Sequence, residues 1–219
     1  MVVVMKIGGS LMKFPVELRS LMRGLVDLAN DLLIVPGGGA FADVVRDADR
    51  TFKISDELSH RMAILGMDQY GLLLHSLVED RSKVVYDTII DKDNLLTIIL
   101  PSQLMLKEEE LEHSWRVTSD SIAAYIAHLI DADRLILVKD VDGIFDMDPK
   151  KNVEARLFRE LSARDVLLNE GYGCVDPYLP KLLLKYRLVC VVVNGLFVDR
   201  VVNVVKGEST LCTVIDPNF

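Results

Sequence analysis

The sequence predicts an α/β fold in which a mostly parallel central sheet is sandwiched between helices. Short runs of Val, Ile and Leu alternate along the chain with longer segments whose apolar residues recur at helical spacing. Of the 219 residues, 50% are hydrophobic but only 6% are aromatic, a composition typical of buried parallel strands and their covering helices. Several apolar runs end in glycine or proline. This alternation favours helices on both faces of one parallel sheet.

The first half of the chain begins with a strand, because the apolar run from Val2 to Ile7 closes at two glycines. A helix is expected from Pro15, since proline suits a first helical turn and the leucines that follow share one face. Ser55 is a good N-cap for a long helix. The elements expected here are strands at 2–7, 32–35 and 97–100 and helices at 15–30, 40–50 and 55–79.

The second half continues the same alternation. Ser119 or Asp120 is expected to cap a helix, and Asp142-Gly143 and Asp148-Pro149 to form turns. The elements expected here are helices at 120–130, 162–170 and 180–186 and strands at 134–139, 188–193 and 211–215. The stretches 41–53 and 82–116 are the most irregular, and we expect them to form flaps around a substrate.

Charge and composition exclude several classes of function. The net charge of −8 and a pI near 5.0 disfavour binding to nucleic acid and to anionic membranes. No apolar run approaches the roughly 18 residues of a membrane span, and Met1 leads directly into the first strand without a basic leader. Three widely separated cysteines predict neither a disulfide framework nor a structural metal site. We therefore expect a cytoplasmic protein that binds small molecules.

Two glycine-rich turns follow buried strands and predict anion binding. The turn Lys6-Ile7-Gly8-Gly9-Ser10 places a lysine beside two glycines, and Pro36-Gly37-Gly38-Gly39 leads into a helix. Exposed backbone N–H groups at such turns can hold phosphate oxygens. Neither turn is a Walker A loop or a dinucleotide fingerprint. Because the carboxyl ends of parallel strands meet at one edge, the two turns can face each other. Ordinary tight turns remain the alternative.

Five motifs in order resemble the amino acid kinase family, and the resemblance spans almost the whole chain. The two glycine-rich turns resemble its first two motifs, and Val117-Thr118-Ser119-Asp120 resembles the third. Lys139-Asp140-Val141-Asp142-Gly143-Ile144-Phe145, followed by Asp148-Pro149, resembles the nucleotide-site signature. Lys181 stands where the family carries a lysine in Met-x-x-Lys, although Tyr178 replaces the Met and Pro180 precedes the lysine.

The resemblance implies a kinase that uses ATP and Mg²⁺. It implies that Lys6 contacts the transferred phosphoryl group, that Lys181 offsets charge on the leaving ADP, and that Asp120 orients both lysines. In the alternative interpretation Asp120 serves only as a helix cap, and Asp140 and Asp142 serve only as turn formers. The implied ATP-binding residues are Lys6, Gly8, Gly9, Ser10, Lys139, Asp140, Asp142, Gly143, Phe145 and Lys181. No metal-ligating residue is assigned.

The acceptor is expected to be a small phosphate monoester. The residues expected to bind it are Gly37, Gly38, Gly39, Arg46 and Asp68. The segment His60–Gly71 is similar to an archaeal branch of the family that converts [5-(aminomethyl)furan-3-yl]methyl phosphate to its diphosphate in methanofuran biosynthesis. Asp68 could pair with the amine of that acceptor or form a structural contact.

Other functions remain open on the sequence. Uridylate, isopentenyl phosphate and carboxylate acceptors are alternatives, as is a non-catalytic nucleotide or oxyanion store. Isopentenyl phosphate kinases carry a histidine in Gly-Ser-Phe-Gly-His, where this chain has Asp43 after Ala40-Phe41-Ala42.

The expected organisation is a single domain, 1–219, with two lobes. Residues 1–115 would form the acceptor-binding and oligomerisation lobe, and residues 116–219 the ATP-binding lobe. The resemblance implies a homo-oligomer, in which the apolar helix at 55–79 forms either an interface or internal core.

Overall fold

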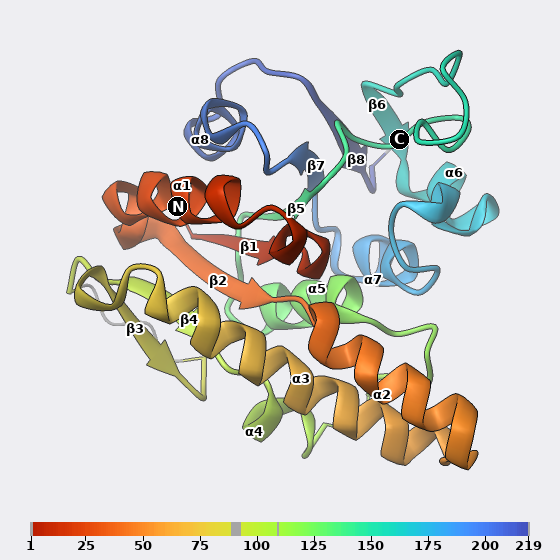
Figure 1. Cartoon of the computed structure of the whole chain (residues 1–219). Coiled ribbons are helices and arrows are strands. Elements are labelled where there is room, and N and C mark those ends of the chain that lie inside the picture. Colours follow the sequence, from red (N-terminus) through yellow and green to blue (C-terminus); the bar gives the residue numbers. More distant parts are fainter. Residues whose placement is uncertain (1, 89–92, 109, 219) are drawn as a thin grey trace.

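Within residues 2–88, 93–108 and 110–218, which the computed structural model describes, eight strands form one sheet (Figure 1). In spatial order the strands are β3 (Ser82–Val85), β4 (Leu96–Ile99), β2 (Leu32–Pro36), β1 (Val3–Ile7), β5 (Arg134–Lys139), β7 (Cys190–Asn194), β8 (Cys212–Asp216) and β6 (Glu160–Ser162). Neighbouring strands run parallel except β7 and β8, which pair antiparallel. The predicted mostly parallel sheet is therefore confirmed.

Strand β1 lies inside the sheet and pairs with β2 on one side and β5 on the other. All five of its residues are buried, as the apolar run predicts. The register sets Lys6 opposite Val35 and Leu137, so the three strands end at the same edge. Because the loops after parallel strands meet at that edge, the glycine-rich turns after β1 and β2 and the loop after β5 lie together.

Helices cover both faces of the sheet, which confirms the predicted sandwich (Figure 1). One core cluster joins the sheet to α1 (Pro15–Leu25), the 3-10 helix η2 (Val26–Asp31) and α8 (Val198–Lys206). A second cluster on the other face joins it to α5 (Ser119–Leu129), α6 (Ala163–Leu168) and α7 (Leu179–Tyr186). The short elements are α4 (Ser102–Met105) and the 3-10 helices η1 (Gly9–Lys13), η3 (Glu79–Arg81) and η4 (Glu170–Gly173). No helix among the described residues is long and apolar enough to cross a membrane.

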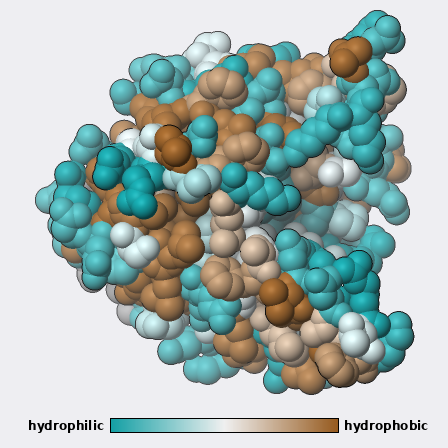
Figure 2. Space-filling model, in the orientation of Figure 1, coloured by the Kyte–Doolittle hydropathy of each residue, from teal (hydrophilic) through white to brown (hydrophobic). Residues whose placement is uncertain are grey.

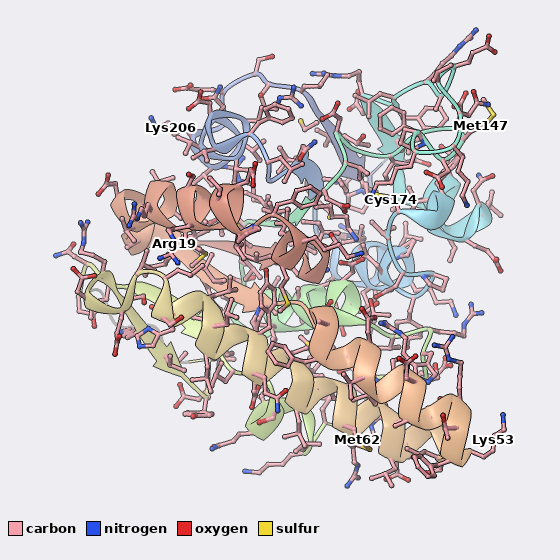
Figure 3. The ribbon with its side chains drawn as sticks, in the orientation of Figure 1. Arg19, Lys53, Met62, Met147, Cys174 and Lys206 are labelled. Carbon is pink, nitrogen blue, oxygen red and sulfur yellow. The ribbon has the colours of Figure 1, made fainter. Side chains whose placement is uncertain are left out.

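A pair of helices, α2 (Gly39–Phe52) and α3 (Asp56–Ser76), packs together and projects beyond the sheet (Figure 1). Lys53 ends α2 and lies at the outer tip of the pair (Figure 3). The hydroxyl of Ser55 caps α3 by accepting from the Leu58 N–H at 3.4 Å, as predicted from the sequence. Towards the C-terminal end of α3, the Tyr70 and Leu74 side chains are fully buried. They belong to the core cluster that also contains residues of α1 and α8.

The observed elements depart from the predicted ones where the chain has few apolar residues. The helix expected at 15–30 ends at Leu25 and tightens into the 3-10 helix η2. Strands β3 and β6 were not predicted, because each is short and lies at an edge of the sheet. The flap expected at 41–53 is wrong, because those residues form the regular helix α2 up to its C-cap Lys53. The flap expected at 82–116 contains β3, β4 and α4. Residues 89–92 and 109 of that stretch lie outside the described residues.

Candidate active site

Three charged side chains, Lys6, Asp120 and Lys139, form a buried ion triad at the carboxyl edge of the sheet. Asp120 Oδ1 accepts from Lys6 Nζ at 2.7 Å, and Asp120 Oδ2 accepts from Lys139 Nζ at 2.8 Å. Lys6 lies on β1, Lys139 is the last residue of β5, and Asp120 lies in the first turn of α5. Only 5% of Lys6 and 3% of Asp120 are exposed. The fold thus brings together two predicted catalytic residues.

The charges of the ion triad offset the cost of burying them. Burial acts to raise the pKa of Asp120, but the ammonium groups of Lys139 and Lys6 hold the pKa of that carboxyl well below its usual range. Burial lowers the pKa of Lys6, and Asp120 only partly offsets this. Burial also acts to lower the pKa of Lys139, but Asp120 outweighs it and raises that pKa. Two lysines around one carboxylate favour the binding of an anion beside them.

Lys181 lies outside the ion triad. Its side chain is exposed, and its ammonium lies 5.1 Å from the centre of the Tyr178 ring. The contact with Asp120 that the resemblance gives to Lys181 is made here by Lys139, which also donates to the Cys174 carbonyl at 2.7 Å. A catalytic role for Lys181 therefore stays a prediction.

The two glycine-rich turns pack backbone against backbone beside the ion triad. A Cβ on Gly9 would lie 2.2 Å from the Gly39 nitrogen, and a Cβ on Gly37 would lie 2.7 Å from the Gly9 nitrogen. Neither side chain could be accommodated without a shift of the backbone, so glycine is required at both positions. The Gly37 N–H also donates to the Ile7 carbonyl at 2.9 Å. The predicted meeting of the two turns is therefore observed.

A cavity of about 670 Å³ opens on one side of the ion triad, and we refer to it as the large cavity. The residues predicted to bind ATP that line it are Lys6, Gly8, Gly9, Ser10, Lys139, Asp140, Gly143 and Phe145. Asp142 and Lys181 are not among its lining residues. Cys174 and Met147 line it as well, with Met147 on the outlying loop after β5 (Figure 3).

Asp140 and Asp142 have different surroundings. The Asp140 carboxylate accepts from the Ser10 hydroxyl at 2.7 Å and from Lys150 Nζ at 2.5 Å, which ties the turn after β1 to the loop after β5. Burial acts to raise the pKa of Asp140, but Lys150 leads the contacts that lower it overall. Asp142 instead accepts from Asn194 and Arg200 at 2.8 and 2.6 Å. Asp142 therefore anchors the loop to β7 and α8.

A second cavity of about 330 Å³, the small cavity, opens on the other side of the ion triad. Gly38, Gly39 and Arg46 line it, as predicted for the acceptor, whereas Gly37 and Asp68 do not. The Asp68 carboxylate instead accepts from the Ser102 N–H at 3.1 Å at the start of α4. Burial raises the pKa of Asp68. Its predicted contact with an acceptor stays a prediction.

Two aromatic side chains that line the small cavity, Trp115 and His60, are not among the residues expected to bind the acceptor. The Trp115 indole N–H donates to Asp49 at 2.9 Å, and the Arg46 guanidinium lies 4.9 Å from the indole centre. His60 is buried and stacks on His113 at 5.4 Å, and burial lowers the pKa of His60. No spacing pattern links these positions, because they come from α2, α3 and the segment before α5.

The two cavities meet at the ion triad, and both are lined by Lys6, Gly9, Ser10 and Lys139. Figure 2 shows the molecule hollowed between the projecting α2–α3 pair and the layer that contains α1. Two ligands bound in these cavities would approach each other over Lys6 and Lys139, which suits the transfer of an anionic group between them.

The sequence matches the model of the amino acid kinase family over residues 1–194. It is 35% identical to [5-(aminomethyl)furan-3-yl]methyl phosphate kinase from Methanocaldococcus jannaschii, over 97% of this chain and 96% of that protein. It is 27% identical to a uridylate kinase from Methanococcus aeolicus, over 89% of this chain and 87% of that protein.

Solved structures share the fold. The crystal structure of uridylate kinase from Archaeoglobus fulgidus superimposes with a TM-score of 0.75 and 23% identity, covering 98% of this chain and all of that one. Aspartate kinase from Synechocystis superimposes with a TM-score of 0.74 and 18% identity, covering 99% of this chain and 40% of that one. These similarities establish the arrangement of the elements.

Replacing Asp120 tests the ion triad through stability. Asp120→Asn should lower the free energy of unfolding by about 3–5 kcal/mol at pH 7, because it leaves the buried Lys6 and the partly buried Lys139 without their counter-charge. Because the folded-state pKa of Asp120 is depressed, its contribution is fully present above the ordinary carboxyl pKa of about 3.9 and is lost as the pH falls below that value. The variant should therefore lose less stability than the wild type between pH 5 and pH 2, as measured by urea unfolding.

Asp27→Asn is the matched control, because Asp27 pairs with Arg81 at the exposed surface. That pair should contribute less than about 1 kcal/mol. Equal losses for the two variants at pH 7 would contradict a buried triad in which Asp120 is the shared counter-charge of both lysines.

Proposed function

This chain belongs to the amino acid kinase family, and we propose that it transfers the γ-phosphoryl group of ATP to the phosphate of a small monoester. The favoured acceptor is [5-(aminomethyl)furan-3-yl]methyl phosphate, which would become its diphosphate. The observation that carries the proposal is the meeting of two cavities over Lys6 and Lys139. The identity to the M. jannaschii kinase along almost the whole chain supports this acceptor.

The large cavity is the proposed ATP site. Gly8 and Gly9 of the turn after β1 let a ligand approach the backbone closely, and Lys6 and Lys139 offer positive charge, so the residues present fit a polyphosphate. Mg²⁺, when bound, would neutralise negative charge on the phosphates. Among the described residues no cluster of His, Cys, Asp or Glu could hold a metal ion by itself. Mg²⁺ in kinases is usually held by one or two carboxylates together with substrate phosphates, and Asp140 is a carboxylate that lines this cavity.

The ion triad would act by positioning and charge stabilisation. Lys6 and Lys139 lie where the cavities meet and would hold the phosphate oxygens of both substrates in the transfer arrangement. Asp120 would keep both ammonium groups in place. The family resemblance also gives Lys181 a role at the leaving ADP, which its exposed position leaves as a separate prediction.

The state of Asp120 favours an acceptor that is already anionic. An alcohol acceptor needs a base to remove its proton, but Asp120 is held ionised by two lysines and its low pKa makes it a weak base. A phosphate monoester has a second pKa near 6 and needs no base at neutral pH. Phosphate and carboxylate acceptors both satisfy this condition.

The lining of the small cavity favours a phosphate monoester of a small, largely apolar molecule. Arg46 offers a guanidinium, and apolar side chains including Met12, Ile64 and Met67 form part of the wall. Asp43 also lines this cavity, where its carboxylate pairs with Arg46 at 2.6 Å and holds the guanidinium beside the cavity. Uridylate, isopentenyl phosphate and carboxylates remain the alternatives to be compared.

We also propose that the protein is a cytoplasmic homo-oligomer. The homo-oligomer is supported by the outer face of α3, where Leu58, Leu65 and Leu72 are exposed at seven-residue spacing and could pack against a second copy of the chain.

The acceptor is tested by kcat/KM with ATP and Mg²⁺ for five candidates: the aminomethylfuran phosphate, uridylate, isopentenyl phosphate, glutamate and acetylglutamate. We expect kcat/KM for the aminomethylfuran phosphate to exceed that for each other candidate by at least about 100-fold, which corresponds to about 2.7 kcal/mol in activation free energy. A carboxylate that wins by a wide margin would overturn the phosphate acceptor but leave the family assignment standing.

Arg46→Ala should lower kcat/KM for the acceptor by about tenfold or more, mainly through KM, and leave the KM for ATP nearly unchanged. A hydrogen bond to a charged group contributes about 1.5–3 kcal/mol, which corresponds to this factor. Arg50→Ala is the control, because Arg50 is exposed one turn further along α2, pairs with Asp47 and does not line the small cavity. If both variants behave alike, Arg46 does not bind the acceptor.

The second lysine is identified by comparing Lys139→Met with Lys181→Met. We expect Lys139→Met to lower kcat at saturating substrates by at least about 100-fold, the scale for losing one preorganised group. We expect Lys181→Met to lower it by less than about tenfold, because Lys181 contacts the Tyr178 ring and no cavity. Single-turnover kinetics at pH 7.5 measure both. The opposite ranking would restore to Lys181 the role that the resemblance implies.

A further inference from the structure

A second buried carboxylate, Asp176, lies behind the ion triad and lines neither cavity. It precedes α7 and is only 7% exposed. Its oxygens accept from the N–H and hydroxyl of Thr118 at 3.0 and 2.8 Å, from the N–H and hydroxyl of Ser121 at 3.0 and 2.5 Å, and from the N–H groups of Tyr178 and Leu179 at 3.2 and 2.8 Å. One side chain thus collects six hydrogen bonds.

These bonds join the beginnings of two helices. The Thr118 and Ser121 donors belong to the start of α5, and the Tyr178 and Leu179 donors to the start of α7. The first N–H groups of a helix have no partner within it, so a carboxylate placed between two helix starts satisfies donors of both. Burial, followed by the neighbouring charge of Asp120, raises the pKa of Asp176. A carboxylate in such a place is costly unless its hydrogen bonds are complete.

The same residue is connected to the ion triad on both sides. Thr118 and Ser121 lie on either side of Asp120 in the sequence. Their hydrogen bonds to Asp176 therefore fix the first turn of α5, which carries Asp120. The Asp176 N–H donates to Asp120 Oδ2 at 3.3 Å. Two residues earlier, the Cys174 carbonyl accepts from Lys139. The position of the triad therefore depends on where Asp176 holds α5 and the 174–176 backbone.

We propose that Asp176 is a positioning residue for phosphoryl transfer, which holds Asp120, and through it Lys6 and Lys139, in the transfer arrangement. The proposal rests on the proposed kinase function for its catalytic readout. Asp176 itself touches neither substrate. Its loss should therefore lower kcat more than it raises either KM, whereas loss of a substrate-binding residue would raise KM.

Asp176→Asn keeps the shape of the side chain but replaces an acceptor oxygen with a donor that faces N–H groups. We expect kcat to fall by at least about 30-fold, with both KM values within about threefold of the wild type. Asp165→Asn is the control, because Asp165 also accepts from a hydroxyl at a helix start, that of Ser162 before α6, and lines neither cavity. Its kcat should be unchanged.

A double-mutant cycle separates positioning from simple helix capping. If Asp176 acts through Asp120, adding Asp176→Asn to Asp120→Asn should lower kcat by less than about threefold further. Where Asp176→Asn does not fold, Ser121→Ala removes one of the six bonds and should show a smaller loss with the same non-additivity. A folded Asp176→Asn variant with wild-type kcat would overturn the proposal, as would losses that simply multiply.

The same cycle in urea unfolding distinguishes failure of this inference from failure of the kinase function. If the wild-type chain transfers phosphate to no acceptor, the proposed function is wrong, but the coupling of Asp176 to Asp120 can still be measured by stability. Non-additive losses of stability would support the positioning contact. Additive losses would overturn it.

Discussion

The buried pairing of one carboxylate with two lysines is the constraint on which the rest of the site depends. Asp120 holds Lys6 and Lys139 in a region where unpaired charges would be strongly unfavourable. Lys6 lies on β1 and Lys139 ends β5, and these strands pair directly in register. The sheet therefore sets the spacing of the lysines, and α5 supplies the carboxylate that pairs with both and holds them in place.

This arrangement divides the site into two cavities with one junction. The glycine turns touch through their backbones, which leaves room for ligands and for N–H groups at the edge of the sheet. The lysines at the junction attract anions from either side. Because the only carboxylate that contacts them, among the described residues, is already doubly paired, the site is suited to positioning charged groups and poorly suited to removing protons.

The sequence predicted those features that depend on local patterns. The apolar runs predicted the inner strands of the sheet. The two glycine-rich turns, together with Lys6 and Asp120, predicted where the site lies. The sequence did not reveal that Lys139 pairs with Asp120, since that contact depends on how far β5 extends beside β1. Asp176 and Trp115 were missed for a similar reason. The partners that connect Asp176 to α5 lie 55–58 residues away in sequence, and the partner of Trp115 lies 66 residues away.

The central claim is that one phosphoryl group passes directly between the two cavities. It is tested most directly by using ATP made chiral at the γ-phosphorus with oxygen isotopes, together with the acceptor that turns over fastest, and determining the configuration of the product. A single in-line transfer inverts the configuration at phosphorus, and this account predicts inversion. Retention would show an even number of transfers through a phosphorylated enzyme, which would contradict it.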